Sequence, residues 1–181
     1  MAAKPIDIKT YSPKALDVFF IDNSVWMYLF CPLGNYNHNK QKHYSSFLQS
    51  IQSSKSTIFI NSLVLSEFAN RYLRMDFERW KEEEEIPTAG YKKDFIGNKR
   101  YSETVEEVKR NINQIMKLCE KSSDNFNAVN LDSVLLHLSS IDFNDSYIIE
   151  LAKLDNWKIV TDDEDFLKCS DHDLVIISDL N

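Results

Sequence analysis

The chain has 181 residues, of which 43% are hydrophobic and 27% are charged, and this composition is typical of a folded protein with one core. Its three glycines are not clustered, which excludes the glycine-rich phosphate loops of dinucleotide-binding and P-loop proteins and the nucleophile elbow of α/β-hydrolases. The net charge is −7, and residues 122–181 hold 3 basic and 13 acidic side chains. Such an acidic block forms either a solvated face or a site for divalent cations.

Cysteine and histidine usage excludes several other kinds of site. Three isolated cysteines without a CxxC pair exclude a disulfide framework and a zinc knuckle, and four histidines without HExxH or HxxxH spacing indicate surface or packed side chains. No apolar run approaches the roughly 20 residues that span a bilayer, and residues 1–13 lack the apolar core of a signal peptide. We therefore expect a cytoplasmic protein without a membrane segment. The three cysteines are Cys31, Cys119 and Cys169, and the four histidines are His38, His43, His137 and His172.

The first part of the chain alternates between strand and helix patterns. The short apolar run Asp17-Val-Phe-Phe-Ile-Asp22, which ends in an acid, predicts a buried strand, and a short helix is expected over residues 24–30. Apolar residues at helical spacing predict an amphipathic helix over residues 39–52. A second strand is predicted at residues 57–61, and a long helix from Ser62 to about Glu85.

Prolines and glycines break the helical pattern between Ile86 and Tyr101, which predicts a loop. Thr104-Val-Glu-Glu107 has the form of a capping box and should begin the next helix. Two further helices and then two strands are predicted at residues 131–138, 144–155, 157–161 and 174–178. Strands that alternate with helices predict an α/β fold with a central, mostly parallel sheet flanked by helices in three layers. One domain over residues 1–181 is expected.

Acidic residues follow the ends of the predicted strands. Asp22 ends the first strand, Glu67 lies in the helix after the second strand, and Asp162, Asp163 and Asp165 follow the third. Asp145 lies at the start of the helix before that third strand. Each acid taken alone has an ordinary structural explanation, such as a helix cap or a turn. In parallel sheets, however, ligands gather at the carboxyl ends of the strands, so these acids should converge there.

Converging carboxylates repel one another and raise one another's pKa values unless cations neutralise them. Oxygen ligands without histidine or thiolate favour Mg²⁺ or Mn²⁺ over zinc. Such ions can activate water toward a phosphodiester. The sequence therefore predicts a Mg²⁺ or Mn²⁺ site.

Four segments together resemble the ordered motifs of PIN-domain nucleases, and the resemblance is closest to the VapC-type ribonuclease toxins of toxin–antitoxin pairs. These segments are Val18-Phe-Phe-Ile-Asp22-Asn-Ser24, Leu63-Val-Leu-Ser-Glu67-Phe-Ala, Asp145-Ser-Tyr-Ile-Ile-Glu-Leu-Ala152 and Ile159-Val-Thr161-Asp-Asp163-Glu-Asp165-Phe166. The resemblance covers about residues 17–178, and the final T-x-D-x-D-F motif is its most specific part. The chain is longer than a typical toxin of this type, and the extra length lies in a short N-terminal extension, residues 1–16, and in a helical and loop arm, about residues 76–121.

The resemblance implies a PIN-like fold and a metal-dependent endoribonuclease. It implies that four carboxylates bind the metal and carry the catalysis, that Asp165 is an accessory metal ligand, and that Ser24 and Thr161 support the site. The four are Asp22, Glu67, Asp145 and Asp163. It also implies an RNA substrate, a cognate antitoxin protein and a homodimer.

Several alternatives remain open at the level of the sequence. A haloacid-dehalogenase-type phosphatase also begins with an apolar strand that ends in Asp, but its general acid would fall at Ser24. An RNA-processing or decay nuclease of the PIN type without an antitoxin would show the same motifs as a toxin. A non-catalytic PIN-like scaffold usually lacks one or more of the acids, whereas this chain keeps all four.

Residues 71–121 hold 12 of the 21 basic side chains. They form either a pair of solvated helices with mixed charge, which Glu82–Glu85 favours, or an arm that holds an RNA backbone beside the acids. An antitoxin helix could also dock on the apolar faces here. The residues proposed to contact RNA are Arg71, Arg74, Lys92, Lys93, Lys99 and Arg100.

Overall fold

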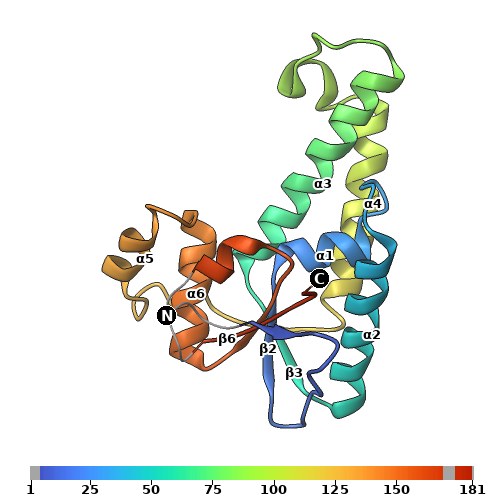
Figure 1. The fold of residues 1–181 in the computed structure, drawn as a ribbon. Helices are drawn as coiled ribbons and strands as arrows, with labels where there is room; N and C mark the ends of the chain where they lie inside the picture. The colour runs from blue at the N-terminus through green and yellow to red at the C-terminus, as the bar shows by residue number, and fades with distance from the viewer. Residues whose placement is uncertain (1–4, 169–173, 181) are drawn as a thin grey trace.

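The computed structural model describes residues 5–168 and 174–180. It consists of a parallel sheet with helices on both sides and a long helical hairpin that projects from one end (Figure 1). Cys169 and His172 lie outside the described residues. The described residues form six strands, which are β1 (Ile6–Asp7), β2 (Val18–Ile21), β3 (Thr57–Ile60), β4 (Glu120–Lys121), β5 (Lys158–Val160) and β6 (Val175–Ser178).

The helices come in two groups along the chain. The first group is α1 (Asn23–Phe30), α2 (His38–Ser54), α3 (Ser62–Glu83), the short π-helix η1 (Tyr91–Phe95) and α4 (Lys99–Ile115). The second group is α5 (Leu131–His137), α6 (Phe143–Asp155) and the 3₁₀-helix η2 (Glu164–Lys168). Among the described residues, no helix combines the length and the apolar character that crossing a membrane requires.

The strand order is β1-β6-β5-β2-β3-β4, and every neighbouring pair is parallel. The predicted α/β fold with a parallel sheet between helices is therefore confirmed. Strand β2 lies between β5 and β3, with Ile21 opposite Val160 in the register. The carboxyl ends of β2, β3 and β5 consequently meet at the same edge of the sheet.

The core explains why apolar runs form these strands. Successive side chains of a strand point to opposite faces. Phe19 accordingly meets Phe47 of α2 edge to face at 5.8 Å, whereas Phe20 stacks on Trp157 with ring centroids 5.2 Å apart. Phe19 and Phe20 are both fully buried, so both faces of β2 are covered. A strand covered on both faces requires an unbroken apolar run, as the sequence predicted.

The hairpin formed by the outer part of α3, η1 and the start of α4 has its own small core (Figure 1). Phe95 is fully buried and packs against Phe77, Trp80 and Tyr101, with ring centroids 5.3 to 5.6 Å apart. The buried Asp76 accepts hydrogen bonds from Arg100, whose Nη2 lies 2.6 Å from Asp76 Oδ1. The segment predicted as an arm thus folds as a packed helical hairpin.

The predicted start of the fourth helix, at Thr104, is wrong. Helix α4 begins at Lys99, because the Asn98 side chain accepts a hydrogen bond from the backbone N–H of Tyr101 and caps the helix there. The hydroxyl of Thr104 instead contacts Asp76 and the carbonyl of Arg100 inside the hairpin. The predicted loop, residues 86–101, therefore contains η1 and the first residues of α4.

Two short edge strands have no counterpart among the predicted elements. Strand β1 belongs to the segment predicted as an N-terminal extension, and it pairs with β6 through Ile6 and Asp7. Strand β4 pairs with β3 through Glu120 and Lys121, which are both exposed. Two-residue strands leave no apolar pattern in a sequence, because their pairing is set by the neighbouring strand.

Candidate metal centre

Asp22 connects the ends of the two central strands. It follows β2, caps α1 and is 4% exposed, and its Oδ2 accepts hydrogen bonds from Ser24 Oγ at 2.6 Å and from Thr161 Oγ1 at 3.1 Å. Ser24 Oγ in turn accepts a hydrogen bond from the backbone N–H of Asp162 at 3.0 Å. Ser24 and Thr161 therefore hold the acid and the loop after β5 together. Burial raises the pKa of Asp22, although these hydrogen bonds oppose the shift.

Three carboxylates form a compact group beside this junction. Asp145, Asp163 and Asp165 each offer an oxygen, and these oxygens lie within 4.8 Å of one another. Thr161 Oγ1 accepts a hydrogen bond from the backbone N–H of Asp163, and Asp163 Oδ1 accepts one from the backbone N–H of Asp165. The loop after β5 therefore directs two acids toward the start of α6. We call Asp145, Asp163 and Asp165 the acid group.

Asp145 has a strongly raised pKa. Burial is the largest cause, and the nearby charges of Asp22, Asp142, Asp163 and Glu67 add to it, so the pKa of Asp145 rises to about 8. Those charges come from four different segments of the chain, which shows that Asp22 and Glu67 lie near enough to act on the acid group electrostatically. The structure thus groups three of the five acids that the sequence predicted as metal ligands, and the charges of the other two, Asp22 and Glu67, help to raise the pKa of Asp145.

Glu67 lies in the second turn of α3 and is held by Asn23, the first residue of α1. Its Oε1 accepts a hydrogen bond from Asn23 Nδ2 at 2.9 Å. Burial raises the pKa of Glu67, and the charge of Asp22 adds to this effect, whereas Asn23 and Arg71 counter it. Glu67 and Asp22 are not within the 4.8 Å separation that defines the acid group. The five acids therefore form a compact group of three with two flanking carboxylates.

Sequence reasoning missed two polar residues at this site. Asn23 is fully buried and directs Glu67, while its own Oδ1 has no hydrogen-bond partner among the described residues. Asp142 caps α6 by accepting a hydrogen bond from the N–H of Asp145. Its position three residues before Asp145 is the usual signal of a helix cap and could have been recognised in the sequence. The orientation of the Asn23 side chain leaves no such signal.

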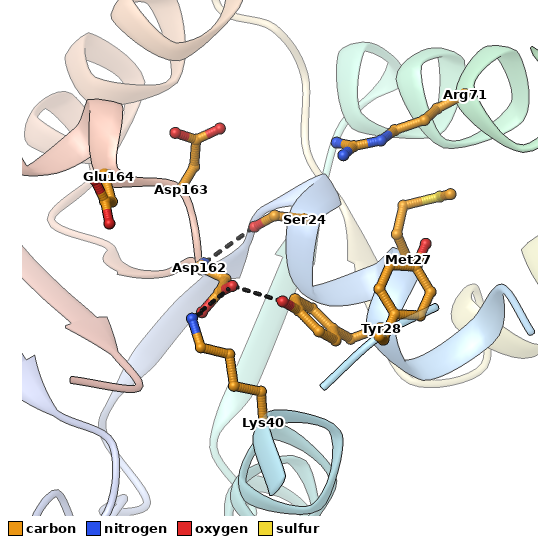
Figure 2. Close-up of a pocket in the computed structure, with 9 residues that line it drawn as sticks. Ser24, Met27, Tyr28, Lys40, Arg71, Asp162, Asp163 and Glu164 are labelled. Atoms are coloured by element: carbon orange, nitrogen blue, oxygen red, sulfur yellow. Dashed lines mark hydrogen bonds and ion pairs between the residues drawn. The ribbon is translucent and has the colours of Figure 1, made fainter. Parts of the chain in front are cut away.

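Asp162 and Asp163 are neighbours in sequence but have different surroundings. Asp162 contacts Lys40 Nζ at 2.8 Å and accepts hydrogen bonds from the hydroxyls of Tyr28 at 2.8 Å and Tyr44 at 2.9 Å. Figure 2 shows the two carboxylates directed away from each other, with Lys40 below Asp162. Asp162 is therefore neutralised within the protein, whereas Asp163 faces the other acids.

The donor set fits a divalent cation that prefers oxygen. The acid group contains only carboxylates, and it is the one group of three or more such side chains within residues 5–168 and 174–180 that could hold an ion. Repulsion that raises the pKa of Asp145 would be relieved by a bound cation. Lys168 forms a hydrogen bond to Asp165 Oδ1, so this acid is partly neutralised already. Asp145 and Asp163 are accordingly the stronger candidate ligands, with Asp165 flanking them.

The predicted RNA-contacting residues have four different environments. Arg71 lines a pocket next to Asp163, whereas Arg74 lies 4.1 Å over the Tyr91 ring in the hairpin. The exposed Lys92 and Lys93 lie in η1, and Lys99 is 3.7 Å from Glu103. Arg100 binds Asp76 and also Glu83 at 3.0 Å. These pairs stabilise the hairpin and engage the Arg100 guanidinium within the protein.

Asn23→Ala should weaken the binding of divalent cations by about 10-fold, because residues that orient metal ligands typically contribute 10- to 100-fold to affinity. The change removes the hydrogen bond that holds Glu67. Isothermal titration calorimetry with Mn²⁺ measures the affinity. Asn70→Ala, an exposed asparagine on α3, is the matched control and should bind as the parent does. Equal affinity of Asn23→Ala and the parent would contradict the role assigned to Asn23.

Comparisons with known proteins bear directly on this site. The PIN domain family model matches residues 19–171, which include Asp22, Glu67 and the acid group. No curated protein gives a match. The fold is similar to a chain of the crystal structure of VapBC2 from Rickettsia felis bound to a DNA fragment from their promoter, with a TM-score of 0.52 and 14% identity over 89% of this chain and 98% of that chain. The resemblance predicted from the four sequence motifs is thereby confirmed, and the chain belongs to the PIN domain family.

Proposed function

We propose that the protein is a divalent-metal-dependent endoribonuclease that hydrolyses RNA phosphodiester bonds at the acid group. The observation that supports this most directly is the convergence of Asp145, Asp163 and Asp165 within 4.8 Å, with Asp22 and Glu67 beside them. Family membership favours nuclease activity, since PIN domains are generally nucleases. We propose Mg²⁺ or Mn²⁺ as the ion, because all the candidate ligands are carboxylates.

Each part of the site has a task in this proposal. Asp145 and Asp163 hold the ion, with Asp22, Glu67 and Asp165 as the flanking carboxylates. When bound, a divalent cation supplies charge neutralisation at the scissile phosphate and a more acidic water. Ser24 and Thr161 keep Asp22 fixed through the 2.6 Å and 3.1 Å hydrogen bonds. Fixed carboxylates need little rearrangement when charge develops, which is the main source of electrostatic catalysis.

Purified protein incubated with total RNA and Mg²⁺ should produce new RNA ends, and EDTA should abolish them. Mapping of the ends by sequencing would identify the cleavage sites. Mn²⁺ should replace Mg²⁺, whereas Ca²⁺ should bind and support little cleavage. Activity that survives exhaustive EDTA treatment would contradict a metal-dependent mechanism. Absence of new ends with both Mg²⁺ and Mn²⁺ would contradict the nuclease assignment.

We further propose that this nuclease is the toxin of a toxin–antitoxin pair and acts in the cytoplasm, where its RNA substrate is. The similarity in fold to a VapBC2 chain supports an antitoxin partner. Exposed apolar side chains on and around α5 also favour a protein partner, since monomeric proteins rarely expose large contiguous apolar patches. They include Phe126, Leu135, Leu136, Leu138 and Phe143. A homodimer is the second assembly that this surface could support, and light scattering of the purified protein would reveal it.

A further inference from the structure

Helix α2 holds the loop that carries two members of the acid group. The hydroxyl of Tyr44, which is 1% exposed, lies 3.0 Å from the carbonyl oxygen of Thr161 and 2.9 Å from Asp162 Oδ1, and it can donate a hydrogen bond to either. The same hydroxyl accepts a hydrogen bond from the backbone N–H of Asp179 at 3.1 Å. Thr161 directly follows β5 and Asp179 directly follows β6, so one buried oxygen atom joins the ends of two neighbouring strands.

This contact fixes the place from which the acids of the loop project. Thr161 Oγ1 accepts a hydrogen bond from the backbone N–H of Asp163 at 2.9 Å, and Asp163 Oδ1 accepts one from the backbone N–H of Asp165. The conformation of the loop is therefore built on Thr161, whose own carbonyl oxygen lies against the Tyr44 hydroxyl. A displacement of Thr161 would carry both carboxylates away from Asp145, and a misplacement of about 1 Å can cost a catalytic site about 100-fold in rate.

The loop also contains two consecutive acids, Asp162 and Asp163, and a shift by one residue would direct the wrong one at a cation. Three groups prevent this by holding the first carboxylate: the hydroxyls of Tyr44 at 2.9 Å and Tyr28 at 2.8 Å, and Lys40 Nζ at 2.8 Å. Figure 2 shows this carboxylate directed away from Asp163. Capture of the first acid leaves the second to face the rest of the acid group.

We propose that Tyr44 is a positioning residue of the metal centre, whose hydroxyl holds the loop so that Asp163, and not Asp162, faces the cation. The inference rests on the proposed function, because it concerns the same acid group, and it adds a residue that none of the acidic motifs in the sequence indicates. Three protein groups engage the Tyr44 hydroxyl, so Tyr44 acts through the loop and not as a ligand.

Tyr44→Phe should weaken the binding of Mn²⁺ by about 10-fold, which is the lower end of what residues that orient metal ligands contribute to affinity. Phenylalanine removes only the hydroxyl and leaves the charge of the site unchanged, so a loss of affinity reports geometry. Isothermal titration calorimetry measures the affinity. Tyr72→Phe is the matched control, because Tyr72 is also 1% exposed and donates a hydrogen bond to Glu107 of α4 at 3.1 Å. The control should bind Mn²⁺ as the parent does.

Hydrogen exchange in EDTA tests the same inference without a metal. The backbone amides of residues 161–165 should exchange about 5-fold faster in Tyr44→Phe than in the parent, as expected for the loss of one hydrogen bond. Tyr72→Phe should leave this exchange unchanged. Tyr28→Phe removes one of the three groups that hold Asp162 and should cause a smaller increase. If Tyr44→Phe does not fold, unchanged exchange in Tyr28→Phe would overturn the inference.

A cleavage assay with Mg²⁺ separates this inference from the proposed function. If Mn²⁺ binding depends on the Tyr44 hydroxyl but RNA is not cleaved, the positioning role is supported and the nuclease assignment is lost. If RNA is cleaved while Tyr44→Phe and the parent have equal Mn²⁺ affinity, the positioning role alone is overturned. Equal losses of affinity in Tyr44→Phe and Tyr72→Phe would overturn it as well, because they would show a general effect of removing a buried hydroxyl.

Discussion

Asp163→Asn should reduce the rate of RNA cleavage by about 100-fold or more while the protein remains folded. Replacing residues that only orient metal ligands already costs up to about 100-fold, so the loss of a ligand should cost at least that much. The fold should persist, because an asparagine oxygen can still accept the hydrogen bond that Asp163 Oδ1 receives from the backbone N–H of Asp165. Initial rates with Mg²⁺ and a thermal melt measure the two expectations.

Asp132→Asn is the matched control for this experiment, because it removes one exposed negative charge from α5 without touching the site. The control separates the loss of a ligand from a general change of net charge. Asp162→Asn does not serve this purpose, since Asp162 is bound to Lys40 and two tyrosines. Full activity of Asp163→Asn would show that this carboxylate is not a metal ligand.

Asp145→Asn should stabilise the metal-free protein at alkaline pH, by a few kcal/mol at most. The folded state raises the pKa of Asp145 from 3.8 to about 8. Between these values the folded protein holds a proton that the unfolded chain has released, so the free energy of unfolding falls as the pH rises. The stabilisation of the folded state relative to a permanently ionised Asp145 is fully present below about pH 4 and is lost once the pH passes about 8. Asparagine does not ionise, so the variant avoids this loss.

Urea unfolding of the parent and the variant at pH 5 and pH 9, both in EDTA, measures the difference. The gap in the free energy of unfolding should widen in favour of Asp145→Asn toward pH 9. Mg²⁺ at pH 9 should stabilise the parent and have little effect on the variant, because a ligand that binds only the folded state stabilises it. A gap that does not change between pH 5 and pH 9 would show that the Asp145 carboxylate is not buried among other charges.

The sequence predicted the central strands well because their physical signal is local. An unbroken apolar run such as Val18–Ile21 is needed wherever both faces of a strand are covered, and an acid directly after it marks the carboxyl end. The edge strands β1 and β4 carry no such signal, since two residues that pair with a neighbour need no particular side chain. The start of α4 was misplaced because Asn98 and Thr104 are both good caps, and only packing against Asp76 distinguishes them.

The acids of the site were predictable for a similar reason, whereas their partners were not. Asp22, Asp145 and Asp163 lie at element ends that the sequence shows, so their convergence follows from a parallel sheet. The neutralisation of Asp162 depends on Lys40 and Tyr44, which come from α2, a helix far away in sequence. Likewise, no spacing in the sequence indicates that Arg100, a predicted RNA contact, binds the buried Asp76. Charge pairs of this kind depend on tertiary structure and have no spacing rule.

The position of β2 between β3 and β5 has a consequence for the order in which the protein is assembled. Strand β3 follows β2 in the chain, so these two strands can pair as soon as both have left the ribosome, whereas β5 is synthesised about a hundred residues later. Until β5 arrives, Asp22 lacks the hydrogen bond from Thr161, and Asp163 and Asp165 have not yet been made. We therefore expect a nascent or prematurely terminated chain to be harmless to the RNA around it, including the message from which it is translated.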